Sequence, residues 1–144
     1  MPLFDVTDWV PGTYCVPTAL AAITGKKIPD VIEAINKQAI LLGMKTFTQF
    51  EGIPPKCWLQ TLPSLGIGDR ADTGHQGLTI DELFRASASP SPMLVLTSHI
   101  EMGMGHVFAA HGDFVVDTYT DGKVTNFSEV PEDMKGFKVR AEIY

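Results

Sequence analysis

Basic residues and long apolar runs are both scarce in this chain of 144 residues. It has 11 Lys and Arg against 17 Asp and Glu, which gives a formal net charge of -6. Because the basic side chains are scattered, no basic stripe is present to neutralise nucleic-acid phosphates. No stretch reaches the roughly 18 apolar residues that a membrane-spanning helix needs, and the acidic start does not match an export signal. We therefore expect a cytoplasmic protein with no nucleic-acid and no membrane partner.

Cysteine is the next scarce residue, since Cys15 and Cys57 are the only two in the sequence. Disulfide frameworks belong to exported chains with several paired cysteines. Without an export signal, two cysteines predict a pair of reduced thiols rather than a disulfide.

Spacings typical of metal sites are also missing. The sequence contains neither Cys-x-x-Cys nor His-Glu-x-x-His, and the nearest approach to a ligand pair is His99 with Glu101. Such spacings bring several ligands to one point, and two residues without a third do not complete a site. We therefore expect no metal and no other cofactor.

Helical patterns fill the first part of the chain and strand patterns fill the last part. With 44% hydrophobic residues and no stretch resembling a linker, one domain over residues 1–144 is expected. The patterns predict helices over 16–24, 29–42, 56–62 and 79–86, and strands over 93–97, 105–110, 114–119 and 137–143. Helices followed by antiparallel strands predict an α+β fold.

A cysteine stands at the start of the first predicted helix, which Gly25 is suited to end. The unpaired N–H groups and the positive dipole end at a helix N-terminus favour a thiolate over a thiol. Cys15 is therefore the candidate nucleophile. Cys57 lies within a predicted amphipathic helix, and we interpret it as a core residue.

A predicted hairpin brings His106 and Asp117 close together. If its turn consists of Gly112 and Asp113 alone, Phe108 lies opposite Asp117. Asp117 is then a diagonal neighbour of His106 on one face of the sheet, where its carboxylate can orient the imidazole. A three-residue turn would send Asp117 to the other face unless a bulge intervened.

Together these residues form a candidate Cys-His-Asp triad. Cys15 would attack a carbonyl carbon as the nucleophile. His106 would hold the thiolate as an ion pair and then protonate the leaving amine. Asp117 would fix the tautomer of the imidazole.

The sequence also offers candidates for binding the oxyanion and the substrate. The backbone N–H of Cys15 at the helix start is the first oxyanion donor. The upstream residues Thr7, Trp9 and Thr13 are candidates for the second. Gly105 has no Cβ, so a substrate backbone can approach the adjacent histidine closely.

Two segments of the chain resemble small papain-like cysteine peptidases. One is Cys-x-Pro-x-Ala-Leu-Ala-x-Ile-Thr-Gly, and the other is Gly-His followed by a hairpin with Val-Asp-Thr. The chain is most similar to compact bacterial and phage-encoded forms, related in layout to bacteriocin leader-processing peptidases. The resemblance implies a papain-like fold, with the nucleophile helix and further helices packed on a C-terminal antiparallel sheet. It also implies cleavage of a peptide or isopeptide bond in a protein or peptide substrate.

By position, the resemblance makes Cys15 similar to the family nucleophile, His106 to its base and Asp117 to its orienting residue. The family usually places a Gln a few residues before the cysteine as an oxyanion donor. This chain departs from that pattern, with Trp9 six residues before Cys15 and no Gln nearby.

Two other functions stay open at this level. The same triad supports an acyltransferase of the transglutaminase type, although 144 residues is short for such a family. A catalytically silent papain-like binding module that inhibits or recruits a partner protein is the second alternative, and the missing Gln favours it. The reactivity of Cys15 distinguishes a hydrolase from a silent module.

Overall fold

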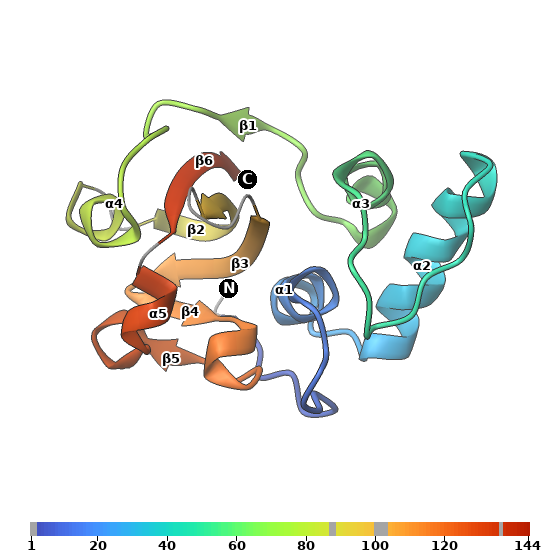
Figure 1. The fold of residues 1–144 in the computed structure, drawn as a ribbon, viewed down its shortest axis with the longest axis horizontal. Coiled ribbons are helices and arrows are strands. Elements are labelled where there is room, and N and C mark those ends of the chain that lie inside the picture. Colours follow the sequence, from blue (N-terminus) through green and yellow to red (C-terminus); the bar gives the residue numbers. More distant parts are fainter. Residues whose placement is uncertain (1–2, 87–88, 100–103, 136) are drawn as a thin grey trace.

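The computed structural model describes residues 3–86, 89–99, 104–135 and 137–144. In these ranges the chain has an α+β fold with five α-helices and a six-stranded antiparallel sheet of order β1-β6-β2-β3-β4-β5 (Figure 1). The helices are α1 (Cys15–Thr24), α2 (Ile28–Leu41), α3 (Pro55–Thr61), α4 (Ile80–Ala86) and α5 (Glu132–Lys135). The strands are β1 (Ala71–Asp72), β2 (Ser89–His99), β3 (Met104–Gly112), β4 (Phe114–Val116), β5 (Thr125–Asn126) and β6 (Lys138–Ile143). Among the described helices, none is long and apolar enough to cross a bilayer.

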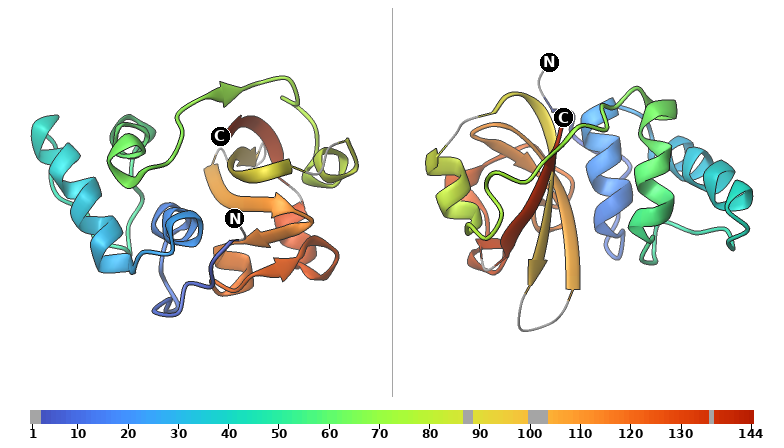
Figure 2. Two further views of the ribbon diagram at one scale, coloured as in Figure 1. Left: turned by 180° about the vertical axis from the view of Figure 1, so that it is seen from behind. Right: turned by 90° about the horizontal axis from the view of Figure 1, so that it is seen from above.

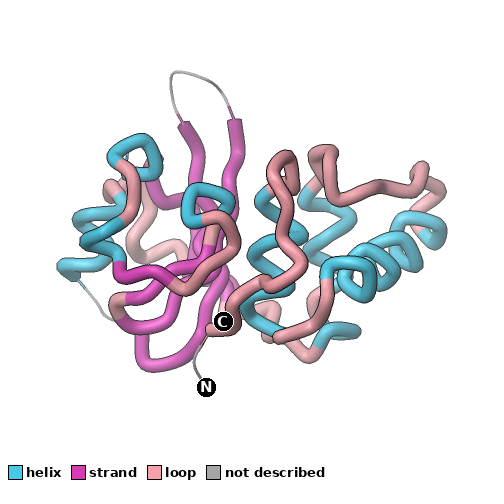
Figure 3. The backbone as a smooth tube through the Cα atoms, turned by 90° about the horizontal axis from the view of Figure 1, so that it is seen from below, coloured by secondary structure: helices cyan, strands magenta, loops and turns pink. Residues whose placement is uncertain are grey.

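Helices cover both faces of the sheet. Figure 2 shows α1, α2 and α3 on one side and α4 with α5 on the other, and Figure 3 shows the strands between the two groups. Successive side chains on a strand point to opposite faces. Alternate residues of the central strands accordingly join two cores: Leu94, Val107 and Ala109 pack with α1, whereas Met93, Val95 and Phe108 pack with α4 and α5. The central part of the sheet is therefore buried on both faces.

Local chemistry sets the ends of the helices. Helix α1 stops at Gly25, whose φ of 73° closes the helix with a left-handed residue. Helix α2 starts at Ile28, slightly before the predicted position, because its N–H donates to Oδ2 of Asp8 at 3.0 Å. A capping box starts α4, since Thr79 and Glu82 each accept a hydrogen bond from the other's backbone N–H.

The hairpin between β3 and β4 has a two-residue turn, one of the two alternatives that the sequence leaves open. His111 pairs with Phe114 and Ala109 pairs with Val116, which leaves Gly112 and Asp113 as the turn. This register is the one that the contact between His106 and Asp117 requires.

The predicted strand over 114–119 is too long. Strand β4 ends at Val116, and Thr118–Thr120 forms a 3-10 turn instead. The cause is the side chain of Asp117, which accepts a hydrogen bond from the N–H of Thr118 and so caps the turn. Asp121 then closes the turn with a φ of 55°.

The other strands also differ in part from the prediction. Strand β2 extends beyond the predicted range 93–97 at both ends, with a register shift between Ser89 and Met93. Strands β1 and β5, of two residues each, were not predicted because pairs this short carry no periodicity.

A buried carboxylate fastens the turn after β1 to the last strand. Glu142 of β6 has no solvent exposure, and its two oxygens bond Nδ1 of His75 and the hydroxyl of Tyr144. Burial is the larger influence on Tyr144, and together with the hydrogen bond to Glu142 it raises the pKa of Tyr144 to about 12. Each oxygen of the buried group thus has a partner, as a buried polar group requires.

Close packing at Gly122 gives a prediction about stability. Its φ is 73°, and a Cβ there would lie 2.8 Å from Cβ of Trp9 and 3.1 Å from Cβ of Val6. Gly43 has nearly the same φ, 71°, but a Cβ added there would meet no atom within 4 Å. We expect Gly122→Ala to lower the free energy of unfolding by about 1–3 kcal/mol more than Gly43→Ala, measured by urea denaturation. Equal losses would show that the N-terminal segment does not pack tightly against this turn.

Candidate active site

The residues of the candidate triad meet at one cavity. Cys15 and His106 line a cavity of about 740 Å³, and Asp117 lies directly behind the histidine. The wall is built from residues 12–16 around the start of α1, residues 52–58 before and within α3, strands β2 and β3, the segment from Phe137 to Arg140, and the turn after β4. Helix and sheet thus each contribute one of the two candidate reactive side chains.

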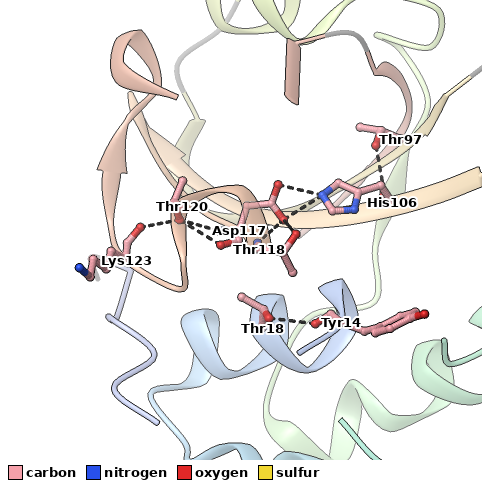
Figure 4. Close-up of polar contacts among 8 residues, drawn as sticks. All are labelled: Tyr14, Thr18, Thr97, His106, Asp117, Thr118, Thr120 and Lys123. Carbon is pink, nitrogen blue, oxygen red and sulfur yellow. Dashed lines mark hydrogen bonds and ion pairs between the residues drawn. The ribbon is translucent and has the colours of Figure 1, made fainter. Parts of the chain in front are cut away.

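Asp117 holds the imidazole of His106 from one side. Nε2 lies 2.8 Å from both Oδ1 and Oδ2 of the carboxylate (Figure 4). The side chain of Asp117 has no solvent exposure, and that of His106 is 10% exposed. A contact in such a dry position is little screened by water.

The residues that follow β4 fix the position of the Asp117 carboxylate. The N–H of Thr118 donates to Oδ1 of Asp117 at 2.7 Å, and the N–H of Asp117 donates to Oγ1 of Thr120 at 3.0 Å. The Thr120 hydroxyl also donates to the carbonyl of Lys123 at 2.8 Å, a contact drawn in Figure 4. The orientation of the carboxylate therefore follows from local backbone structure.

Aromatic rings and a threonine hold His106 in place. Its ring lies 4.9 Å from that of Phe137 and 5.6 Å from that of Tyr119, measured between centroids. The hydroxyl of Thr97 donates to the carbonyl of His106 at 3.0 Å across the pair of strands β2 and β3. Ring and backbone of the histidine are both constrained.

The surroundings of His106 favour its charged form. Burial is the largest single influence and lowers the pKa of the imidazole, but hydrogen bonds to Asp117 and Cys15 and their charges together outweigh it and raise the pKa from 6.5 to about 10. The side chain is therefore an imidazolium at neutral pH. Since Nε2 is engaged by Asp117, Nδ1 is the nitrogen that remains for Cys15.

Cys15 begins α1 and is half-buried. Tyr14, at the N-cap, provides no side-chain cap, and Pro17 has no N–H. In the part of the chain that the structure describes, the N–H groups of Cys15 and Val16 have no acceptor. The hydroxyl of Thr18 bonds the Tyr14 carbonyl, which anchors this first turn (Figure 4). Two unpaired donors thus lie at the cavity wall.

Thr13 lies at the same wall, and sequence reasoning missed its partner, Gln49. Thr13 is 4% exposed, and its Oγ1 accepts a hydrogen bond of 3.0 Å from Nε2 of Gln49. The carbonyl of Gln49 also accepts from the N–H of Tyr14 at 2.8 Å. Since the Thr13 oxygen already accepts, its hydroxyl proton is left to donate. No local pattern marks Gln49, because only the fold brings its loop beside Thr13.

The other candidates for the oxyanion and substrate separate into two groups. Gly105 lines the cavity, as does Thr13, whereas Trp9 and Thr7 do not. Trp9 packs against Gly122, and its Nε1 is buried without a hydrogen-bond partner in the described structure. Thr7 accepts a hydrogen bond from Lys27 at the surface. The geometry therefore does not support Trp9 or Thr7 as the second oxyanion donor.

Cys57 is buried in the core, as its sequence context indicates. It has no solvent exposure, and its thiol lies 3.6 Å from the carbonyl of Ile35. Burial raises the pKa of this thiol. Both cysteines are free thiols.

No cluster suited to a metal is found among the described residues. They contain no group of three or more His, Cys, Asp or Glu in a position to hold an ion. The side chain of His99 and the whole of Glu101 lie outside the described part of the chain.

Comparisons with known proteins give no relative from which the role of the site follows. No protein-family model, no curated protein and no solved structure matches the chain.

The environment of His106 predicts an unusual titration. We expect NMR of the ring protons to give a midpoint near pH 10 in the native protein, because Asp117 and Cys15 stabilise the imidazolium. Since this pKa lies above the ordinary 6.5, the charged ring stabilises the fold fully below pH 6.5, and this contribution is lost as the pH rises through about 10.

Asp117→Asn is the matched variant for this titration, since asparagine retains the size and the capping ability of aspartate. It should lower the midpoint of His106 and reduce the loss of stability between pH 6.5 and 10. A midpoint near 6.5 in the native protein would contradict the described environment.

Proposed function

We propose that this protein is a thiol hydrolase that cleaves a peptide or isopeptide bond through Cys15, His106 and Asp117. One observation carries the proposal. The fully buried carboxylate of Asp117 is hydrogen-bonded to Nε2 of His106, and the same imidazole interacts with Cys15 at the N-terminus of α1. Nucleophile, base and orienting residue in this order are the requirements for covalent thiol catalysis.

The reaction begins at the sulfur. The Cys15 thiolate, paired with the imidazolium of His106, attacks the carbonyl carbon and forms a tetrahedral intermediate. His106 gives its proton to the leaving nitrogen, the C–N bond breaks, and a thioester remains on Cys15. The neutral imidazole then takes a proton from water, whose oxygen attacks the thioester. The C–S bond breaks, which releases the acid product and restores the Cys15 thiolate beside the imidazolium.

The developing oxyanion needs donors on the same side of the cleft. The N–H groups of Cys15 and Val16 are unpaired within the described structure. The Thr13 hydroxyl, held by Gln49, supplies a third donor at the same wall. This arrangement takes the place of the upstream Gln expected of the papain-like family.

The order of the elements supports a papain-like layout for the fold. Helix α1, with Cys15 at its start, packs against strand β3, which carries His106. The acyltransferase and the silent binding module use the same layout, so chemistry has to separate them. The charged state of His106 favours a reactive thiol over a silent one.

A peptide-library digestion tests the hydrolase. We expect the native protein, and not Cys15→Ala, to generate new peptide N-termini detectable by mass spectrometry. An added primary amine that appears in the products instead of water would show an acyltransferase. The absence of either product would support the silent module.

Alkylation by iodoacetamide tests the ion pair independently of any substrate. At pH 6 we expect Cys15 to react at least tenfold faster in the native protein than in His106→Ala. The reason is that the thiolate is the reactive form, and without the imidazolium a smaller fraction of Cys15 is present as thiolate. Cys57 is the internal control: it is buried with a raised pKa and should stay unmodified in both proteins. Equal rates at Cys15 in the two proteins would overturn the triad.

Two variants of Thr13 test the oxyanion donor. Thr13→Val keeps the shape of the side chain and removes the hydroxyl, and we expect it to lower kcat on a cleaved library peptide about 100-fold. Thr13→Ser keeps the hydroxyl and should retain most of the rate. Equal activity of the two variants would show that the hydroxyl does not act on the transition state.

A further inference from the structure

The wall of the cavity carries a charge opposite to that of the whole chain. The chain has a net charge of -6, yet no Asp or Glu is among the described residues that line the cavity, and Arg140 is among them. Asp117, the nearest carboxylate, is fully buried and bonded to His106 and Thr118. In the described part of this wall, no carboxylate is therefore exposed to compete for the guanidinium.

Arg140 is free to bind an external group. It is exposed on β6, and among the described residues no carboxylate forms an ion pair with it. A guanidinium binds a carboxylate with two parallel hydrogen bonds. Among the described residues, this guanidinium thus has no ion-pair partner at the wall of the cleft.

Strand register places Arg140 at a useful distance from the reactive pair. Thr97 of β2 pairs with His106 of β3 on one side and with Val139 of β6 on the other. Two strand spacings therefore separate His106 from the part of β6 that carries Arg140, about 10 Å in all. Since an extended peptide rises about 3.3 Å per residue, this span covers about three residues.

The rest of the cavity wall is mostly apolar. It includes Ile53, Trp58, Leu96, Val107 and Phe137. Such a wall favours apolar substrate side chains and excludes water from a charge pair beside it. Apart from His106, Arg140 is the only cation among the lining residues that the structure describes, so the wall matches one negative charge rather than two.

From this placement we propose that Arg140 is a specificity residue, which selects peptide substrates carrying an Asp or Glu side chain within about three residues of the cleaved bond. The inference rests on the proposed hydrolase and adds its substrate class. The expected substrate of this cleft is a peptide with one acidic side chain among apolar ones.

The test uses reagents that report binding at the cleft without requiring turnover. Cys15 is alkylated with N-chloroacetyl tripeptide amides and with acetyl-tripeptide chloromethyl ketones, which extend from the sulfur in opposite chain directions. In each series Glu or Gln occupies one of the three positions and Leu the others. Mass spectrometry gives the alkylation rate at Cys15.

In at least one position we expect the Glu reagent to react about fivefold faster than its Gln counterpart, a modest ratio because Arg140 is exposed. Arg140→Gln should reduce the ratio to about one, and Arg140→Glu should bring it below one. Lys138→Gln is the matched control, since it removes an exposed charge from the same strand outside the cavity wall and should leave the ratio unchanged.

Equal ratios in the native protein and Arg140→Gln, or equal effects of the Arg140 and Lys138 variants, would overturn the inference. So would failure of every reagent to reach Cys15. If the Arg140-dependent ratio holds while the peptide library stays uncleaved, the binding preference stands and the proposed hydrolysis fails. The two proposals can therefore fail separately.

Discussion

The burial of the Asp117 carboxylate is the constraint on which the site depends. An interior charge is stable only when hydrogen bonds and an opposite charge replace the water that it has lost. Here the replacements are the N–H of Thr118 and the imidazolium of His106. The first requires the chain to turn directly after β4, and the second requires the two-residue turn of the hairpin. One side chain thus couples the end of a strand, the start of a turn and the orientation of an imidazole.

The two reactive candidates come from different layers of the fold. Cys15 belongs to the helical layer, whereas His106 belongs to the sheet, and α1 packs directly against β3. The relative position of sulfur and imidazole is therefore set by the core between helix and sheet, where Leu20, Val107 and Ala109 are buried. Because close-packed cores deform little, this core stabilises the fold and aligns the site at once.

The sequence predicted best where a local signal sets the geometry. The sequence left two possible turns for the hairpin, of which the structure has Gly112-Asp113, and Gly25 marked the end of α1. The proximity of His106 to Asp117 followed from that register. Gln49 could not be predicted, since its contact with Thr13 joins two loops with no shared periodicity. The position of Arg140 at the cavity could not be predicted either, because in the sequence it resembles any solvent-exposed charge on a strand.

The order of these parts along the chain bears on how the protein is made. Helix α1 leaves the ribosome first, the β3–β4 hairpin follows much later, and β6 with Arg140 comes after both. Chains emerge at about 5–20 residues per second, so for several seconds the nascent polypeptide carries Cys15 without a base beside it or a cleft around it. During synthesis the proposed nucleophile is therefore present before the rest of its site, and it becomes reactive only after the sheet has formed.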